Sequence, residues 1–266
     1  MREKLTAEEL RLSVDRFERQ FGRLYDINIH NPENILPGRG IYTSNHFHHF
    51  DPIFILYAIA RFREVLAHQL AKPDLFRLPV IGRLLKRYQA VVTPRPSQGE
   101  SFDFEDYDRM KEEIETVMAK DEPLSYAYAA RMTRNHQLDE ESAAREAGTA
   151  TSGPLTLVRR HRGLQLVPVA VEVYQKRSPK LVAGAALTLS GIRSWFPVRK
   201  KHAVDVIFGE PVDIDEFLSR EKPGTGKRNG RQDLITHAVE QVYELRRTLA
   251  RKNERDPLRS LDRCLQ

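Results

Sequence analysis

The sequence contains little cysteine and no long apolar run, and each shortage excludes a class of protein. Its one cysteine, Cys264, leaves no internal disulfide to form, which is typical of a protein in a reducing compartment. No stretch approaches 18 consecutive apolar residues, so the sequence predicts no transmembrane helix. Residues 1–5 are not followed by an apolar core, so we expect no secretory signal. We therefore expect a cytoplasmic protein whose contact with a membrane is peripheral.

The charge balance is modestly basic, with 43 Lys and Arg against 37 Asp and Glu and a formal net charge of +6. An excess of this size suits an anionic partner, such as a phosphate group, an acyl carrier or a membrane surface. Nucleic-acid binding is not predicted, because the net charge is small and no recognition motif occurs. The 266 residues are enough for one large domain with a sizeable core.

Helix-like and strand-like patterns alternate along the chain. Apolar residues at three- and four-residue steps predict an amphipathic helix within residues 6–25. Similar reasoning predicts helices over 52–62, 104–119 and 232–252, and strands over 40–44, 88–93, 123–130, 164–173, 181–189 and 203–208. The polar, Ala-rich stretch 135–152 fits either a loop or an exposed helix. The alternation predicts an α/β sheet covered by helices, with an N-terminal helical segment over 1–30 and the α/β domain over 31–266.

A histidine and an aspartate, His46 and Asp51, stand five positions apart, between the β-prone run 40–44 and a predicted helix that starts near Pro52. A strand that ends where a helix begins can fold the Asp51 carboxylate back onto the His46 imidazole. The carboxylate would fix the ring tautomer and leave the other nitrogen free to accept a proton from a hydroxyl. The pair thus predicts direct acyl transfer by general-base catalysis. The spacing alone fits equally well a solvated loop histidine and an aspartate that caps the helix.

The residues around this pair resemble the first block of the glycerolipid acyltransferases, which include the 1-acylglycerol-3-phosphate acyltransferases and carry an Asn-His-x4-Asp signature. The similar residues are 38–46, with Asn45 before the histidine, followed by Asp51. Later blocks resemble residues 88–95, which end in Arg95, the apolar run 166–171 around Pro168, and the late strand and turn 206–211. The resemblance covers about residues 30–215.

This resemblance implies a fold and a set of roles. The fold would be a single mixed sheet covered by helices. His46 would be the general base and Asp51 its orienting partner, while Asn45 and Arg95 would bind substrate. The donor would be an acyl thioester on coenzyme A or acyl carrier protein, with no other cofactor. The acceptor would be the hydroxyl of a lysophospholipid or a related lipid.

The third block departs from the family pattern, which reads Phe-Pro-Glu-Gly-Thr-Arg. The corresponding residues here, 123–134, contain no acid. In one register Arg131 takes the place of the family arginine and Tyr128 that of the glutamate; in the other, Arg134 and Arg131 take these places, and the shared Thr133-Arg134 pair favours it. Both registers predict arginines that bind phosphate or carboxylate groups. The missing acid also permits an alternative, a catalytically decayed protein of the same fold that binds lipid or acyl groups.

Two further patterns bear on ligands. His46, His48 and His49 beside Asp51 suggest zinc, but no distant ligand cluster completes a site, so we predict no metal. The stretches 72–87 and 194–201 combine apolar residues with cations, which suits the interface of an anionic bilayer. Core residues beside solvated cations would give the same pattern. Together with the resemblance, these stretches predict a peripheral O-acyltransferase of lipid metabolism at the inner face of a membrane.

Overall fold

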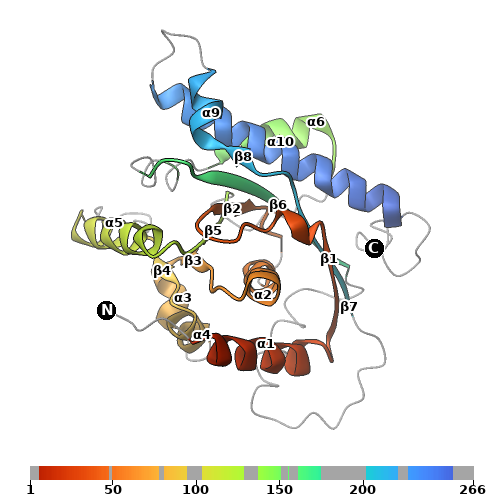
Figure 1. The fold of residues 1–266 in the computed structure, drawn as a ribbon. Helices are drawn as coiled ribbons and strands as arrows, with labels where there is room; N and C mark the ends of the chain where they lie inside the picture. The colour runs from red at the N-terminus through yellow and green to blue at the C-terminus, as the bar shows by residue number, and fades with distance from the viewer. Residues whose placement is uncertain are drawn as a thin grey trace.

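A single sheet runs through the molecule with helices on both faces, as Figure 1 shows. The computed structural model describes residues 6–47, 50–77, 81–94, 104–128, 137–150, 155, 161–174, 202–220 and 227–253. The strand order is β1-β7-β6-β2-β5-β3-β4, and β8 pairs with β6. The α/β fold with one mixed sheet that the sequence predicts is therefore confirmed.

The strands of the sheet are mostly parallel. Their bounds are β1 Tyr25–His30, β2 Ile41–Ser44, β3 His68–Ala71, β4 Val91–Val92, β5 Leu124–Ala127, β6 Gln165–Tyr174, β7 His202–Phe208 and β8 Val212–Asp213. Parallel pairing joins β6, β2, β5, β3 and β4, whereas β7 and β8 run antiparallel to β6. Strand β2 lies between two parallel neighbours and all four of its residues are buried, as expected of a strand covered on both faces.

Helices occupy most of the remaining described chain. Their bounds are α1 Ala7–Phe21, α2 Asp51–Arg63, α3 Pro73–Arg77, α4 Ile81–Arg87, α5 Phe104–Ala119, α6 Glu140–Thr149, α9 Ile214–Ser219 and α10 Lys227–Asn253, with a 3-10 turn at Pro32–Asn34. A capping box between Thr6 and Glu9 starts α1, and stacking of Phe17 on Tyr57 holds α1 against α2. The predicted N-terminal amphipathic helix is thus confirmed.

Several predicted elements need correction. The segment predicted as helical over 1–30 includes strand β1, which pairs in parallel with β7. Strand β3, which the sequence does not predict, directly follows the apolar residues 65–67. The strand expected over 88–93 is shorter than predicted and corresponds to β4. Within the stretch 135–152, which the sequence fits to either a loop or an exposed helix, the structure has helix α6. Asp139 caps this helix by accepting a hydrogen bond from the Ser142 N–H. The strand predicted over 181–189 lies outside the described residues.

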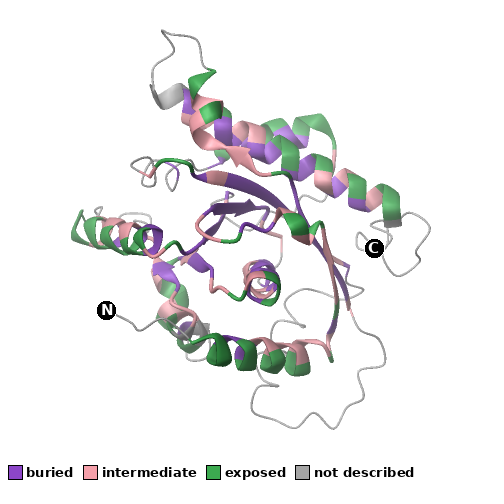
Figure 2. Cartoon of the chain, viewed as in Figure 1, coloured by how far each residue is buried: buried purple, intermediate pink, exposed green. Residues whose placement is uncertain are grey.

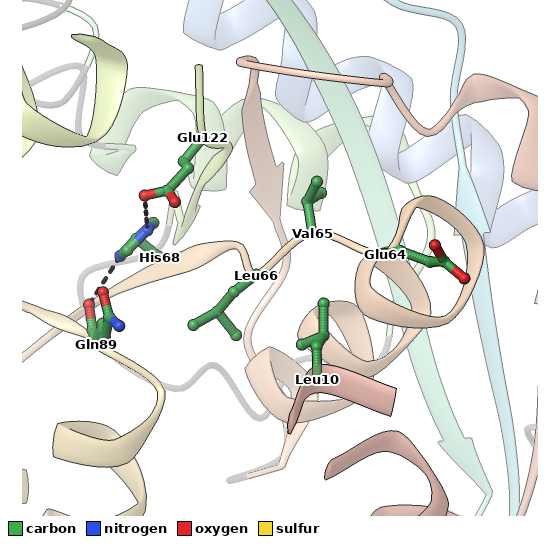
Figure 3. A pocket seen from close by; sticks show the side chains of 7 residues that line it. All are labelled: Leu10, Glu64, Val65, Leu66, His68, Gln89 and Glu122. Atoms are coloured by element: carbon green, nitrogen blue, oxygen red, sulfur yellow. Dashed lines mark hydrogen bonds and ion pairs between the residues drawn. The ribbon is translucent and has the colours of Figure 1, made fainter. Parts of the chain in front are cut away.

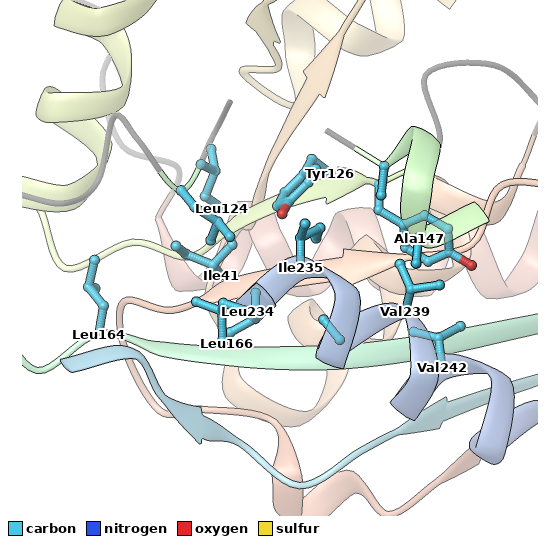
Figure 4. Close-up of a cluster of buried hydrophobic side chains, with 14 of the residues drawn as sticks. Ile41, Leu124, Tyr126, Ala147, Leu164, Leu166, Leu234, Ile235, Val239 and Val242 are labelled. Carbon is cyan, nitrogen blue, oxygen red and sulfur yellow. The ribbon is translucent and has the colours of Figure 1, made fainter. Parts of the chain in front are cut away.

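Two apolar clusters hold the helices to the sheet, one on each face. One joins α5, α6 and α10 to the sheet, and Figure 4 shows part of it, including Ile41, Leu124 and Val239. The other joins α1 and α2 to the opposite face through Phe54, Ile59 and their neighbours. Figure 2 shows the buried sides of these helices turned toward the sheet. Strand β2 lies between the two clusters, with Ile41 in one and Tyr42 in the other.

Candidate active site

The loop that carries His46 lies at the carboxyl end of the central strand. Strand β2 ends at Ser44 and α2 begins at Asp51, so the loop joins these two elements. The Tyr128 N–H donates to the Ser44 carbonyl at 3.0 Å, which brings the end of β5 to the same edge of the sheet. In sheets of this kind, ligands and reacting groups gather at the carboxyl ends of the strands.

His46 and Asp51 approach each other as the sequence predicts. The distance from His46 Nδ1 to Asp51 Oδ2 is 3.7 Å, and the side chains are 25% and 1% exposed. The Nδ1 atom is itself buried, so the exposed surface belongs to the rest of the ring. The distance is too long for a hydrogen bond, but catalytic contacts in ligand-free proteins are often long and shorten when substrate binds. With Asp51 beside Nδ1, the other ring nitrogen would be the one that meets a hydroxyl.

Asp51 is the first residue of α2, not its cap. Phe50 occupies the cap position and provides no side-chain cap, whereas Asp51 Oδ2 accepts from the Phe47 N–H at 2.7 Å. The interpretation of Asp51 as a plain helix cap is therefore wrong. Its carboxylate lies in the first turn, where the helix dipole favours negative charge. Burial and then the Asp51 charge raise the pKa of Tyr25 on β1, a neighbour that sequence reasoning missed because it did not predict β1.

Asn45 binds the backbone of β6. Its Nδ2 donates to the Val171 carbonyl at 2.8 Å, and its Oδ1 accepts from the Val171 N–H at 2.9 Å. The side chain is fully buried. It thus extends the pairing of β2 with β6 by one step beyond Ser44, where the backbone turns into the loop. These contacts fix the residue directly before His46, whereas the sequence predicted that Asn45 binds substrate.

Comparison with known proteins agrees with this geometry. A family model described as Acyltransferase matches residues 26–172, more than half of the chain. The chain belongs to the acyltransferase family. It is 28% identical over 221 residues to a glycerol-3-phosphate acyltransferase of Ectopseudomonas mendocina (strain ymp), over 77% of this chain and 26% of that protein. The chain therefore spans about a quarter of that relative's length.

The fold of a second acyltransferase is also similar. It is the 1-acyl-sn-glycerophosphate (LPA) acyltransferase PlsC from Thermotoga maritima, with a TM-score of 0.51, 15% identity, and coverage of 92% of this chain and 83% of that chain. This similarity confirms the fold that the resemblance implies, and the family match and the relative together support the resemblance to the glycerolipid acyltransferases. Among the described helices, none is long and apolar enough to cross a membrane.

The predicted arginines Arg95, Arg131 and Arg134 lie outside the described residues, as do His48 and His49. Their roles stay predictions. Within the described ranges, no group of three or more His, Cys, Asp and Glu side chains could hold a metal ion.

The third block of this chain leads into a buried polar cluster. Tyr128, which one register puts in the place of the family glutamate, is fully buried and donates to Glu146 of α6 at 2.8 Å. Burial and the Glu146 charge raise the pKa of Tyr128 well above its usual value and that of Tyr243 to about 12. Both phenols therefore stay protonated at neutral pH. The cluster continues to Arg246 of α10, which forms an ion pair with Glu172.

Sequence reasoning missed this cluster. Its acids and its arginine lie on β6, α6 and α10, far apart along the chain. One signal was available: Glu172 interrupts an apolar strand, and Arg246 falls on the apolar side of the helix predicted over 232–252. Charged residues at such positions are almost never fully buried without a partner.

Two hollows lie near the amino ends of the strands, opposite the carboxyl ends where His46 lies. Figure 3 shows the first, where His68 Nε2 lies 2.8 Å from Glu122 and His68 Nδ1 lies 3.0 Å from the Gln89 carbonyl. His68 begins β3, which runs parallel to β5 and hence to β2. The hollows are therefore near the start of the strands, and His46 near the end. The first hollow is lined by Leu10, Glu64, Val65, Leu66, His68, Gln89 and Glu122. The second shares His68, Gln89 and Glu122 with it and is otherwise lined mostly by residues of α5.

Proposed function

We propose that this chain transfers a fatty acyl group from an acyl thioester, on coenzyme A or acyl carrier protein, to a hydroxyl of a lysophospholipid or related acceptor. The observation that carries the proposal is the 3.7 Å approach of His46 to the buried carboxylate of Asp51, at the carboxyl end of β2. Membership of the acyltransferase family supports the same reaction class. One similar protein is named a glycerol-3-phosphate acyltransferase and the other a 1-acyl-sn-glycerophosphate acyltransferase, and the proposed acceptor is of this class.

In this reaction His46 acts as a general base and then as a general acid. The Nε2 nitrogen of His46 accepts the proton of the acceptor hydroxyl, and the oxygen attacks the thioester carbonyl carbon. The carbon–sulfur bond then breaks, and the leaving thiolate takes the proton back from the imidazolium. Asp51 stabilises the imidazolium and fixes the tautomer. The products are an ester and a free thiol, and no acyl-enzyme forms.

The acceptor side of the proposal rests on charge. Arg95, with Arg131 or Arg134, would hold a phosphate or carboxylate group of the acceptor, because a guanidinium binds such groups with two parallel hydrogen bonds. The basic, aromatic stretch 194–201 would attach the protein to the anionic inner face of a membrane. Both parts use cations, in keeping with the net charge of +6.

Thiol release from acyl thioesters, followed with and without lysophospholipid acceptors, tests the reaction. We expect His46→Ala to lower kcat by about 10²–10⁴-fold, the usual range for a positioned general base, and Asp51→Asn to lower it less. His237→Ala, a histidine of α10, is the matched control and should keep full activity. A folded His46→Ala protein with undiminished turnover would contradict the mechanism.

The same assay tests the proposed acceptor site and distinguishes an acyltransferase from the alternative, a lipid binder. With the acceptor in vesicles, we expect faster transfer on anionic than on neutral vesicles, and a loss of this difference at high salt. Arg131→Ala and Arg134→Ala should raise the KM for the acceptor, since a charged hydrogen bond contributes about 1.5–3 kcal/mol. The missing third-block acid favours the alternative of a lipid binder, which would retain bound lipid or acyl thioester and release no thiol.

A further inference from the structure

His46 stands between two residues that are both held by strand β6. Asn45, on one side, exchanges two hydrogen bonds with the backbone of Val171. Phe47, on the other side, lies under the guanidinium of Arg246, with Cζ 4.1 Å from the ring centroid. The Nε of Arg246 donates to Glu172, the residue that follows Val171. Consecutive residues of β6 therefore hold both neighbours of His46, one directly and one through Arg246.

Arg246 is a fully buried cation on α10. Burial opposes its charge, but the Glu172 carboxylate, with smaller contributions from Tyr128 and Tyr243, offsets this effect and holds the pKa of Arg246 above its usual value. The guanidinium also lies over two ring faces, those of Phe47 and, with its centroid at 5.0 Å, Tyr243. An arginine stacked in this way fixes the plane of the ring beneath it.

The position of Phe47 affects both members of the catalytic pair. Its backbone N–H donates to Asp51 Oδ2 at 2.7 Å, the same oxygen that lies 3.7 Å from His46 Nδ1. A displaced Phe47 would move the peptide next to His46 and the hydrogen bond to Asp51 together. A buried ion pair gives little stability over an apolar pair of similar size. We therefore look for the role of the buried Arg246 in the position that it gives to Phe47, and not in stability.

We propose that Arg246 is a positioning residue for acyl transfer: by stacking on Phe47 it sets the distance and orientation of His46 relative to Asp51. The proposal rests on the proposed function. The family model matches residues 26–172, which include Asn45, Phe47 and Glu172. Arg246 lies beyond this range, so the C-terminal helix adds to the site a residue that the family match does not assign.

Three variants test the contact. Phe47→Leu removes the ring and keeps the ion pair with Glu172; Arg246→Lys keeps the charge but loses the planar stack; and a third variant combines both changes. Misplacement of a reacting group by about 1 Å costs as much as about 10²-fold in rate, so we expect each single variant to lower kcat toward this limit with an unchanged KM. Because both changes break one contact, the double variant should be no slower than the slower single variant. Arg251→Lys, with an arginine of the same helix that is 71% exposed, is the control and should keep wild-type kcat.

A second readout does not require activity. Nitrogen NMR of labelled histidine, recorded at one fixed pH, reports the surroundings of the His46 ring. Phe47→Leu and Arg246→Lys should both shift the ring signals of His46, whereas Arg251→Lys should not. If the wild type transfers no acyl group to any acceptor, the proposed function is wrong, and the NMR comparison still tests the positioning role.

Two results would overturn the inference. One is a folded Phe47→Leu protein with wild-type kcat and unchanged ring signals of His46. The other is a double variant whose loss of kcat is the product of the two single losses, because Arg246 would then act by a route other than Phe47. If Arg246→Lys does not fold, Phe47→Leu decides alone, since it leaves Glu172 paired.

Discussion

Single side chains hold the site in place where backbone hydrogen bonds of the sheet end. At Ser44 the ladder between β2 and β6 ends, and the carboxamide of Asn45 makes the next pair of hydrogen bonds with Val171. The contact keeps the start of the catalytic loop in register with the sheet although the loop itself has left it. It is also fully buried, so water cannot replace it when it is lost.

We expect Asn45→Ala to destabilise the protein as well as to lower activity. The Val171 N–H and carbonyl would both be left buried and unsatisfied, and each such group costs about 1–3 kcal/mol. Asn34→Ala is a fitting comparison, because Asn34 makes one hydrogen bond, to the Phe208 carbonyl, from a partly exposed position. Urea unfolding should show a larger fall in midpoint for Asn45→Ala at an unchanged slope. An equal or smaller fall would mean that water reaches Val171.

The approach of His46 to Asp51 could be predicted from the sequence, but the contacts that support the pair could not. The approach of His46 to Asp51 follows from a strand end, a five-residue spacing and a helix start, all local features. The contact of Arg246 with Glu172 joins positions 74 residues apart, and its prediction needs the packing of α10 on β6. The contacts of Asn45 likewise depend on β6 being the neighbour of β2, which no local pattern reveals.

Whole elements follow their local patterns where one face is clearly apolar. Helix α5 has the bounds 104–119 that the sequence predicts. Strand β1 alternates Tyr25, Ile27 and Ile29 with polar residues, but the helical pattern just before it concealed this signal. Strand β3, His68–Ala71, has two polar buried residues and no such alternation, so only its pairing with β5 and β4 makes it a strand.

The edge formed by β1 and β7 should weaken in mild acid. Its first pair is Tyr25 and His202, and burial lowers the pKa of His202 below 6.5, partly offset by a hydrogen bond with the Tyr174 backbone. The unfolded chain therefore binds a proton at this residue before the folded chain does. The stability due to neutral His202 is complete above about pH 6.5 and is lost as the pH falls below it.

Urea unfolding over a series of pH values checks this effect. Between about pH 7.5 and pH 5.5 the free energy of unfolding of His202→Gln should fall less than that of the wild type, because glutamine does not titrate. The difference between the two curves isolates His202 from the other histidines of the chain. Identical slopes, or a steeper slope in the variant, would show that burial does not keep this ring neutral.

At the scale of the whole molecule, the part of the chain after residue 172 contributes elements that both the sheet and its helical cover need. Strand β7 lies between β1 and β6, so it joins the N-terminal strand to the rest of the sheet. Helix α10 covers the face on which α6 also lies, and the same helix carries Arg246 toward the catalytic loop. Residues 26–172, which match the family model, contain neither element. Folding and the geometry of the site thus depend on the same two additions.

We therefore expect a fragment of residues 26–172 not to fold. Strand β1 would lose its one partner in the described sheet, and the apolar residues that α10 buries would be missing: Leu234, Ile235, Ala238, Val239, Val242, Tyr243 and Leu249. Burial of each large one contributes about 1.5–3 kcal/mol, and together they rival the about 5–15 kcal/mol by which a whole domain is stable. A fragment of residues 6–253 keeps every described element and should unfold cooperatively on heating, as measured by circular dichroism. A cooperative transition of the shorter fragment at the same midpoint would show that the matched region is a domain by itself and that α10 is an addition to a finished fold.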